Sequence, residues 1–280
     1  MRALRSWPFA ARALSSSTVA RLINVFCFTK SQRRKLRFAL ALVSPILWTA
    51  TINGCGGDDS AAGTPVASNV IDDFEDGDAI ILIQSGRNGP WYIIDDGTAA
   101  PNGSGTISPP ANSFATAPLE APRTNADGST SKIGVHVRGG NFSSWGAGVG
   151  FNFRWGAAFY DASQYQGFTF YGKTGADPGI TDKSFRVSIT DADTDPSGRV
   201  CGVAPNGLCY DAHGTTFTLT PEWNQFKIAF SEMTQQGWGF QAPFDSTKVI
   251  SLQVNLPGAN MMPGVVHTWD LWIDDVAFYP

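Results

Sequence analysis

Short segments in which apolar and polar residues alternate recur from Lys132 to the end of the chain. In the last of them, residues 270–279, Leu271 and Ile273 alternate with polar or aromatic neighbours. A period of two is typical of a β-strand with one buried face. The segments with this pattern are 132–138, 149–153, 168–171, 185–189, 217–219, 226–230, 252–256 and 270–279. Evenly spaced short strands without an amphipathic helix predict an all-β chain, an antiparallel β-sandwich of the jelly-roll type.

Three further strands are expected nearer the N-terminus, at residues 70–74, 79–83 and 91–94. The stretch 97–122 is made mostly of Pro, Ala, Gly, Ser, Thr and Asn and has little to bury, so we expect a long surface loop there. The inward Phe, Val, Ile and Leu residues are sufficient for one core of a domain of roughly two hundred residues. The sequence therefore predicts a single domain over residues 70–280.

The N-terminal part has the composition of a targeting segment. Residues 1–55 hold nine of the chain's 20 Lys and Arg residues and no Asp or Glu. A basic stretch at 30–37 precedes an apolar run at 38–48, which is too short for a comfortable membrane span. This order is typical of a secretory signal peptide. Residues 1–29 add nothing to such a signal, and a misplaced start site is one explanation for them.

Cys55 follows the apolar run and a small residue, and the site resembles the bacterial lipoprotein box. We expect Cys55 to be lipidated and residues 56–69, rich in Gly, Ser, Ala and Asp, to form a flexible tether. The expected location is the bacterial cell envelope, outside the cytoplasm, with the outer membrane favoured because Gly56 rather than Asp follows the Cys. An ordinary secretory signal and a transit peptide are the alternatives.

The rest of the chain is strongly acidic. With nine basic residues in the targeting segment, eleven remain against 24 acidic ones, a formal net charge of about −13. Phosphate backbones bind to basic surfaces, so this balance argues against nucleic acid as a partner.

Cys201 and Cys209 are the two cysteines outside the targeting segment. In an oxidising compartment we expect them to form a disulfide around residues 202–208. Closing so short a ring stabilises the fold by roughly 2.6 kcal/mol in the loop-entropy model.

Clustered carboxylates follow the first expected strand, in residues 70–76, and lie within the last one, in residues 270–279. If these strands are neighbours, their carboxylates repel one another unless a counter-ion lies between them. A hard cation with oxygen ligands meets that need, so the pattern predicts calcium.

Three stretches, Ile-Asp-Asp-Phe-Glu-Asp-Gly at 71–77, residues 220–228, and Leu-Trp-Ile-Asp-Asp-Val-Ala-Phe at 271–278, together resemble family 11 carbohydrate-binding modules. The resemblance covers residues 70–280 and implies a galactose-binding-like jelly roll. It also implies a structural calcium between the first and last strands. Asp275 is then the leading ligand, with Asp73 and Glu75 as companions.

Asp191, Asp193 and Asp195 occupy alternate positions before Gly198. The spacing is similar to the start of a calcium loop, but the Gly is late and no closing Glu follows, so it is not an EF-hand. Whether this stretch binds a second ion or is an Asx-rich turn stays open at this point.

Sugar recognition needs flat apolar rings together with planar polar side chains that bind hydroxyl groups. Four residues are expected to share the outward face on neighbouring segments, and two Trp residues flanked by Gly are expected in loops. The predicted ligand-binding residues are Arg138, Asn152, Tyr171 and Arg186 on strands and Trp145 and Trp238 in loops.

The sequence thus predicts non-catalytic binding of a β-glucan-like polysaccharide by a lipid-anchored monomer. A protein-interaction module of the same fold is one alternative. A polysaccharide-degrading glycoside hydrolase is the other, although no known catalytic motif is present. The tandem acids 72–73, 95–96 and 274–275 do not supply a catalytic pair, because neighbours on a strand point to opposite faces.

Overall fold

The structure, a computed structural model, describes residues 69–177, 179–203, 207–259 and 266–280. All of them belong to one compact unit, residues 62–280. The predicted signal sequence, Cys55 and the tether up to residue 68 lie outside the described residues. Within the described ranges, no helix is long and apolar enough to cross a membrane.

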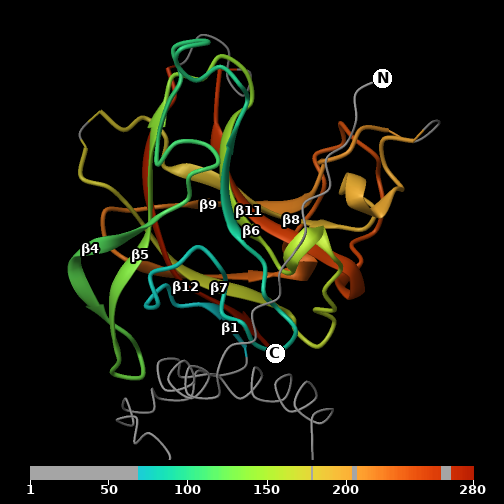
Figure 1. The fold of residues 1–280 in the computed structure, drawn as a ribbon, viewed down its shortest axis with the longest axis horizontal. Helices are drawn as coiled ribbons and strands as arrows, with labels where there is room; N and C mark the ends of the chain where they lie inside the picture. The colour runs from blue at the N-terminus through green and yellow to red at the C-terminus, as the bar shows by residue number, and fades with distance from the viewer. Residues whose placement is uncertain (1–68, 178, 204–206, 260–265) are drawn as a thin grey trace, which may run out of the picture. The chain divides into compact units, whose positions relative to one another are not determined.

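Two antiparallel sheets make up the fold (Figure 1). The seven-stranded sheet consists of β1 (Val70–Asp72), β3 (Thr106–Ser108), β4 (Thr116–Thr124), β5 (Thr130–Gly140), β7 (Gly167–Thr174), β10 (Asn224–Ala229) and β12 (Thr268–Tyr279). The five-stranded sheet consists, in spatial order, of β2 (Trp91–Asp95), β6 (Gly146–Asn152), β11 (Val249–Pro257), β8 (Ser184–Asp191) and β9 (His213–Thr218).

From β5 onward the chain passes repeatedly from one sheet to the other. Inward side chains of both sheets meet in one core that is rich in aromatic rings, in which Phe153 stacks on Phe278 and Trp91 packs against Phe151. Burial of such large apolar side chains is the main force that holds two sheets face to face. The predicted all-β antiparallel sandwich is confirmed.

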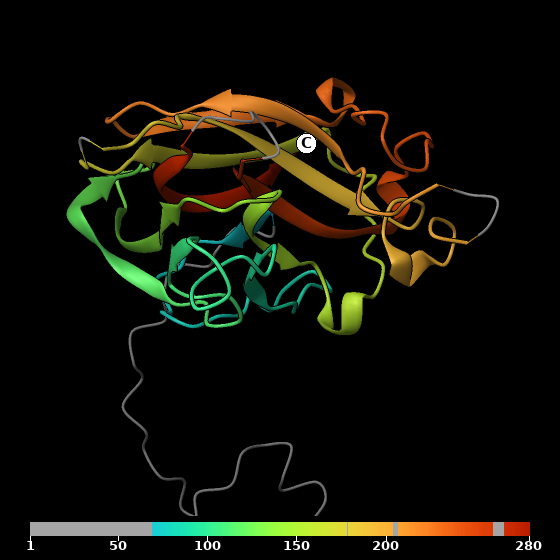
Figure 2. The same cartoon turned by 90° about the horizontal axis from the view of Figure 1, so that it is seen from above.

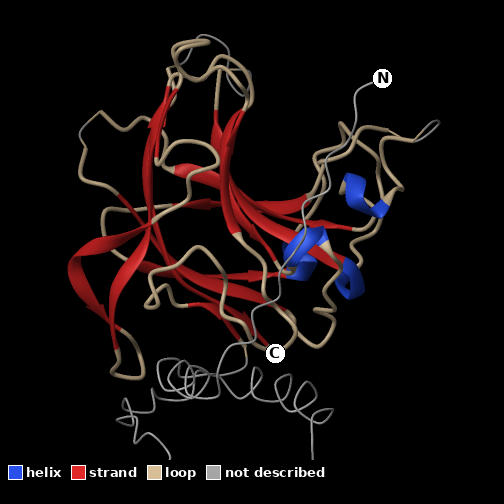
Figure 3. Ribbon diagram, in the orientation of Figure 1, coloured by secondary structure: helices blue, strands red, loops and turns tan. Residues whose placement is uncertain are grey.

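Helical structure in the described part is limited to single 3₁₀ turns, which gather at one end of the sandwich (Figure 3). They are η1 (Trp155–Ala157), η2 (Pro196–Gly198), η3 (Phe230–Glu232) and η4 (Ser246–Lys248). The β4–β5 hairpin lies at the left edge of the described part in Figures 1 and 2.

The first and last strands run side by side, as predicted. Val70 pairs with Ala277 and Asp72 with Val276, and β12 continues past them to pair with β5 and β7. β12 is therefore the central strand of its sheet, and it carries both the acidic pair and a large share of the core.

Two predictions for the N-terminal half are wrong. Residues 79–83 do not form a strand, and their only ladder contact is a single bridge between Ile80 and Pro90. Residues 97–122 are not one loop, because β3 and most of β4 lie there and pair with β5. β4 is an edge strand in which only Leu119 and Arg123 are buried, so its sequence shows no alternation.

Candidate functional site

Polar side chains cover the outer face of the five-stranded sheet. On the central strand β11, Leu252, Val254 and Leu256 are buried in the core, so the residues between them point outward. The register places Gln253 between Gly150 of β6 and Ser188 of β8. We call this surface the polar face; its residues are Tyr92, Asn152, Arg186, Ser188, Thr190, Ser251, Gln253 and Asn255.

These polar groups are connected to one another across the strands. Gln253 Nε2 donates to Asn255 Oδ1 at 2.5 Å, and the Tyr92 hydroxyl lies 3.4 Å from Gln253 Oε1. The hydroxyls of Thr190 and Ser251 are 2.7 Å apart. Burial raises the pKa of Tyr92 to about 12.

Glycines of β6 keep part of the polar face flat. A Cβ at Gly148 would lie 3.1 Å from the Gln253 side chain, and one at Gly150 would lie 2.4 Å from the carbonyl oxygen of Leu252. The absence of a side chain at Gly148 gives the amide of Gln253 room to lie over β6, and glycine at 150 allows the backbones of β6 and β11 to approach closely. The result is a strip of amide and hydroxyl groups rather than a packed layer of side chains.

The four predicted strand residues do not share one face, so this prediction is wrong. Asn152 and Arg186 lie on the polar face, on β6 and β8. Arg138 and Tyr171 lie on β5 and β7 of the other sheet. Alternation separates inward from outward positions, but it does not tell which of two sheets a strand joins.

The outer face of the seven-stranded sheet is closed by its own side chains. Trp272 is buried there, with the His136 ring stacked on it at 4.0 Å and the Lys173 amine 5.7 Å from its ring centre. His136 Nε2 lies 2.7 Å from Asp270 Oδ1. Trp272 is therefore not available to a ligand.

Tyr171 is covered in the same way. The guanidinium of Arg123 lies 3.7 Å above the centre of its ring, a cation–π contact that occupies the face a sugar would need. Arg138 is exposed on this sheet, opposite Asp270. Of the two predicted residues on this sheet, Arg138 is thus exposed, and Tyr171 has one face of its ring covered by Arg123.

Trp145 and Trp238 lie in loops, as predicted, and both side chains are exposed. Trp145 immediately precedes β6, whereas Trp238 belongs to the connection between η3 and η4. Sequence reasoning missed Tyr210, an exposed ring directly after Cys209, and Asp211, a buried carboxylate. No motif marked either of them; their proximity to the disulfide was the one signal.

The acidic pair on β12 binds an arginine. Nη2 of Arg123 donates to Asp274 Oδ2 at 2.9 Å and also contacts the carboxylate of Asp275. Ser131 Oγ donates to Asp274 at 2.6 Å. Burial raises the pKa of Asp274 to about 6, although the hydrogen bonds from Ser131 and Arg123 oppose the shift. Both partners are at most slightly exposed, so this is a buried ion pair.

An irregularity of β12 allows the carboxylates of Asp274 and Asp275 to contact the same side chain, Arg123. The β12–β7 register shifts between Asp274 and Ala277, and Asp275 has a φ of 45°. The expectation that neighbouring acids point to opposite faces is wrong here, because a β-bulge re-aims one of the two side chains.

Glu75 and Asp73 lie close to this pair, as the mirrored sequence pattern predicted. Burial and the neighbouring charge of Asp275 raise the pKa of Asp73 above its usual value. Glu75 Oε1 accepts hydrogen bonds from Lys132 N at 2.7 Å and Ile133 N at 3.0 Å. The loop after β1 is thereby attached to β5.

The side chains as arranged do not fit a calcium ion at this place. Arg123 already supplies the counter-charge to Asp274 and Asp275, and a cation beside a guanidinium is repelled. In the described part of the chain, no group of three or more His, Cys, Asp or Glu side chains is arranged to hold a metal. The calcium ligands Asp73, Glu75 and Asp275 thus stay a prediction from the sequence.

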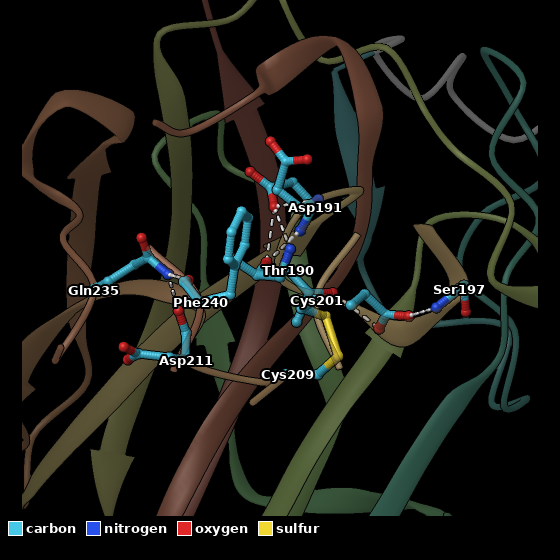
Figure 4. The surroundings of a disulfide bond; sticks show 11 residues. Thr190, Asp191, Ser197, Cys201, Cys209, Asp211, Gln235 and Phe240 are labelled. Carbon is cyan, nitrogen blue, oxygen red and sulfur yellow. Dashed lines mark hydrogen bonds between the residues drawn. A yellow bond between two sulfur atoms is a disulfide. The ribbon is translucent and has the colours of Figure 1, made fainter. Parts of the chain in front are cut away.

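The disulfide between Cys201 and Cys209 is confirmed, with Cα atoms 5.0 Å apart (Figure 4). The acidic stretch before it forms a turn. The buried carboxylate of Asp191 accepts from Thr194 N at 3.0 Å and from Asp245 N at 3.0 Å. The same carboxylate accepts from Asp193 N at 3.2 Å, which is the bond of an Asx turn. The Asx-rich turn, one of the two alternatives for this stretch, is thus present.

No family model matches the chain. Among curated proteins it is similar to endoglucanase 3 of Fibrobacter succinogenes, with 23% identity over 212 residues. That match covers 74% of this chain and 26% of the relative, so the chain spans about a quarter of the relative's length.

Among solved structures, the chain is similar to a family 11 carbohydrate-binding module from Clostridium thermocellum in complex with a β-1,3-1,4-mixed-linked tetrasaccharide. The TM-score is 0.43 and the identity 12%, over 75% of this chain and 94% of the module. It is also similar to the family 30 module of a cellulosomal cellulase from Clostridium thermocellum, with a TM-score of 0.36 and 15% identity over 58% of this chain and 88% of that module.

Proposed function

We propose that the chain binds a neutral, β-glucan-like polysaccharide through the polar face and does so without cleaving it. The observation that carries the proposal is the strip of half-buried amides on the five-stranded sheet, with Gln253 and Asn255 at its centre and the hydroxyls of Tyr92 and of buried Ser and Thr residues beside them. Planar amides both donate and accept hydrogen bonds, which matches the mixed character of sugar hydroxyls. A flat strip along the sheet suits an extended chain better than a small ligand.

Binding on such a surface is expected to be modest for each sugar unit. A single hydrogen bond contributes about 0.5–1.5 kcal/mol after exchange with water. Several contacts along one polysaccharide chain, and several protein copies along the same polymer, then add up through multivalency. The similarity to an endoglucanase supports polysaccharide as the ligand class.

The location belongs to the same proposal. We propose that Cys55 carries a lipid that anchors the protein in the bacterial cell envelope, outside the cytoplasm, so that polymer is held near the membrane. The basic and apolar stretches before Cys55 support this. Membrane fractionation tests it: the full chain is expected in the membrane pellet, and the Cys55→Ser variant in the supernatant. A wild-type chain that stays in the supernatant would contradict the anchor.

Affinity electrophoresis in gels with mixed-linkage β-glucan tests the binding itself. Wild-type protein is expected to be retarded, and Gln253→Ala and Asn152→Ala are expected to weaken the retardation. Arg138→Ala is the matched control, because it removes an exposed polar side chain from the opposite sheet. Unretarded wild-type protein on β-glucan, xylan and mannan would rule the function out.

Hydrolysis is the second candidate, favoured by the similarity to an endoglucanase over most of this chain. A reducing-sugar assay with purified protein and β-glucan separates the two. No release of reducing ends is expected from a binding module. Release that disappears in Asp195→Asn, the acid beside the polar face, would replace the binding proposal by a glycoside hydrolase.

A further inference from the structure

Two loops at the end of the five-stranded sheet present aromatic rings to solvent. Tyr210 directly follows Cys209 and is 61% exposed, and Trp238 lies in the loop 235–242 and is 51% exposed. An exposed Tyr or Trp ring offers a flat apolar surface on which a ligand can pack. Neither ring contributes to the core that holds the sheets together.

The Trp238 loop is built around one buried carboxylate. Asp211 accepts hydrogen bonds from Gln236 N at 2.8 Å, Gly237 N at 2.8 Å and Gly239 N at 3.0 Å. The side-chain amide of Gln241 donates a fourth at 2.8 Å. Burial works to raise the pKa of Asp211, but these donors outweigh it and hold the pKa below its usual value. The loop that carries Trp238 is therefore organised around an ionised Asp211.

A second side chain completes the loop. Gln235 Nε2 donates to the carbonyl oxygens of Asp211 at 2.7 Å and Phe240 at 2.6 Å, and its Oε1 accepts from Ala242 N at 2.8 Å. Figure 4 shows Asp211, Gln235 and Phe240 together on one side of the disulfide. Backbone groups of both halves of the loop are thus held by Asp211 and Gln235.

The two glycines beside Trp238 fit this arrangement. Gly237 has a φ of 93°, which L side chains rarely adopt. A Cβ at Gly239 would lie 2.6 Å from the Cβ of Asp211. The close approach of the loop to Asp211 therefore depends on glycine at both positions.

The disulfide segment and the Trp238 loop are joined to each other and to the polar face. Phe240 N donates to the carbonyl of Leu208 at 2.9 Å. Arg186, on the polar face, donates to the carbonyl of Ala212 at 3.2 Å and to that of Thr234. The bases of both loops are thereby fixed to β8.

Tyr210 borders the polar face at the Tyr92 side. Asp195 Oδ2 lies 3.5 Å from Thr190 Oγ1 on the polar face. Burial and the charge of Asp195 raise the pKa of both Tyr92 and Tyr210. Tyr210 N donates to Thr194 O at 2.8 Å, which holds its backbone against the turn at Asp191. A negative charge at this place disfavours acidic polymers and leaves neutral ones.

We propose that Tyr210 and Trp238 form a preformed stacking platform for sugar rings of a neutral polysaccharide that continues from the polar face, and that Asp211 is the positioning residue of Trp238. This rests on the proposed function. The apolar face of a pyranose packs on an aromatic ring, and a loop that is already ordered loses little entropy on binding. The disulfide between Cys201 and Cys209 likewise restricts the backbone directly before Tyr210.

Isothermal titration with soluble mixed-linkage β-glucan tests the platform. Trp238→Ala and Tyr210→Ala are each expected to lower the affinity about three- to tenfold. The matched control is Trp155→Ala, which removes an equally exposed Trp from the β6–β7 connection and is expected to bind like wild type. Polygalacturonate, a uronic acid polymer, is expected not to bind.

A double-mutant cycle tests the role of Asp211. Asp211→Asn, which keeps one acceptor oxygen, is expected to weaken binding in the wild-type background and to have no further effect in Trp238→Ala. Equal losses in both backgrounds would show that Asp211 does not act through Trp238. Thermal unfolding of each variant shows whether it is folded. If Asp211→Asn does not fold, the binding of the Trp238→Ala and Tyr210→Ala variants still tests whether the two rings bind the polysaccharide.

The outcomes separate this inference from the function on which it rests. Wild-type protein that does not bind any neutral glucan contradicts both. Binding that is lost in Gln253→Ala but unchanged in Trp238→Ala and Tyr210→Ala overturns the platform and leaves the proposed function intact. Binding to polygalacturonate as strong as to β-glucan overturns the choice of a neutral polymer.

Discussion

Nη2 of Arg123 and Oδ2 of Asp274 are 2.9 Å apart at the junction of the edge strand β4 with the central strand β12. The same nitrogen contacts Asp275, and the guanidinium covers the ring of Tyr171. One side chain thereby offsets one of the two negative charges of the acidic pair, attaches the edge strand and covers part of the outer face of its sheet. The two ends of the domain meet within this cluster, since β1 pairs with β12 beside it.

Replacing Arg123 by Met is expected to destabilise the domain by about 3–5 kcal/mol, because two carboxylates lose their buried partner. Chemical denaturation at neutral pH measures the free energy of unfolding. Lys248→Met is the control, since Lys248 pairs with Asp245 at an exposed position, and its loss is expected to cost below about 1 kcal/mol. Similar small effects of both variants would contradict the central role of Arg123.

Removal of calcium is a second, independent test of the cluster around Arg123. With Arg123 as the counter-charge, the melting temperature of the wild-type protein is expected to be the same in calcium and in EDTA. A ligand that binds the folded state raises its stability, so a higher melting temperature in calcium would instead support the ligand set Asp73, Glu75 and Asp275. In that case the side chain of Arg123 must leave the carboxylates.

Much of this junction followed from the sequence, but its central residue did not. Mirrored carboxylates at 70–76 and 270–279 correctly predicted that the first and last strands are neighbours. The clustered carboxylates needed a positively charged partner. Nothing in the sequence indicated that this partner is a distant arginine rather than a metal ion. Arg123 lies in an edge strand that lacks the alternation by which strands are recognised, so its partners on β12 were not foreseeable.

The sequence also predicted only part of the polar face. Alternation placed Asn152 and Arg186 outward, and both are on the polar face. Arg138 and Tyr171 satisfy the same rule but belong to the other sheet. Sheet membership depends on pairing between strands far apart in sequence, and a period of two carries no information about it.

Asp72 is expected to make stability fall as the pH rises. Burial raises its pKa to about 7, against which the donors Phe74 N and Trp91 Nε1 act only in part. The unfolded chain has a pKa near 3.8 at this position. Between these two values the folded state binds more protons than the unfolded state, so its contribution to stability is present below pH 4 and lost as the pH rises through 7.

Denaturation curves from pH 4 to pH 8 measure this dependence. Asp72→Asn cannot ionise, so the fall in unfolding free energy over this range is expected to be smaller than in wild-type protein measured in the same buffers. A variant whose stability falls as steeply as that of the wild type would show that Asp72 is not the group responsible.

Two glycines of β6 provide the sharpest test of the polar face, because the same substitution has different expected consequences at each. At Gly148 a new Cβ meets the flexible side chain of Gln253 at 3.1 Å, so Gly148→Ala is expected to displace that amide and weaken glucan binding with little loss of stability. At Gly150 it meets the backbone carbonyl of Leu252 at 2.4 Å, which cannot move without breaking the β6–β11 ladder. Gly150→Ala is therefore expected to destabilise the fold by about 1–3 kcal/mol. Titration with β-glucan and chemical denaturation of both variants measure the two effects, and unaltered binding by a stable Gly148→Ala protein would move the ligand away from Gln253.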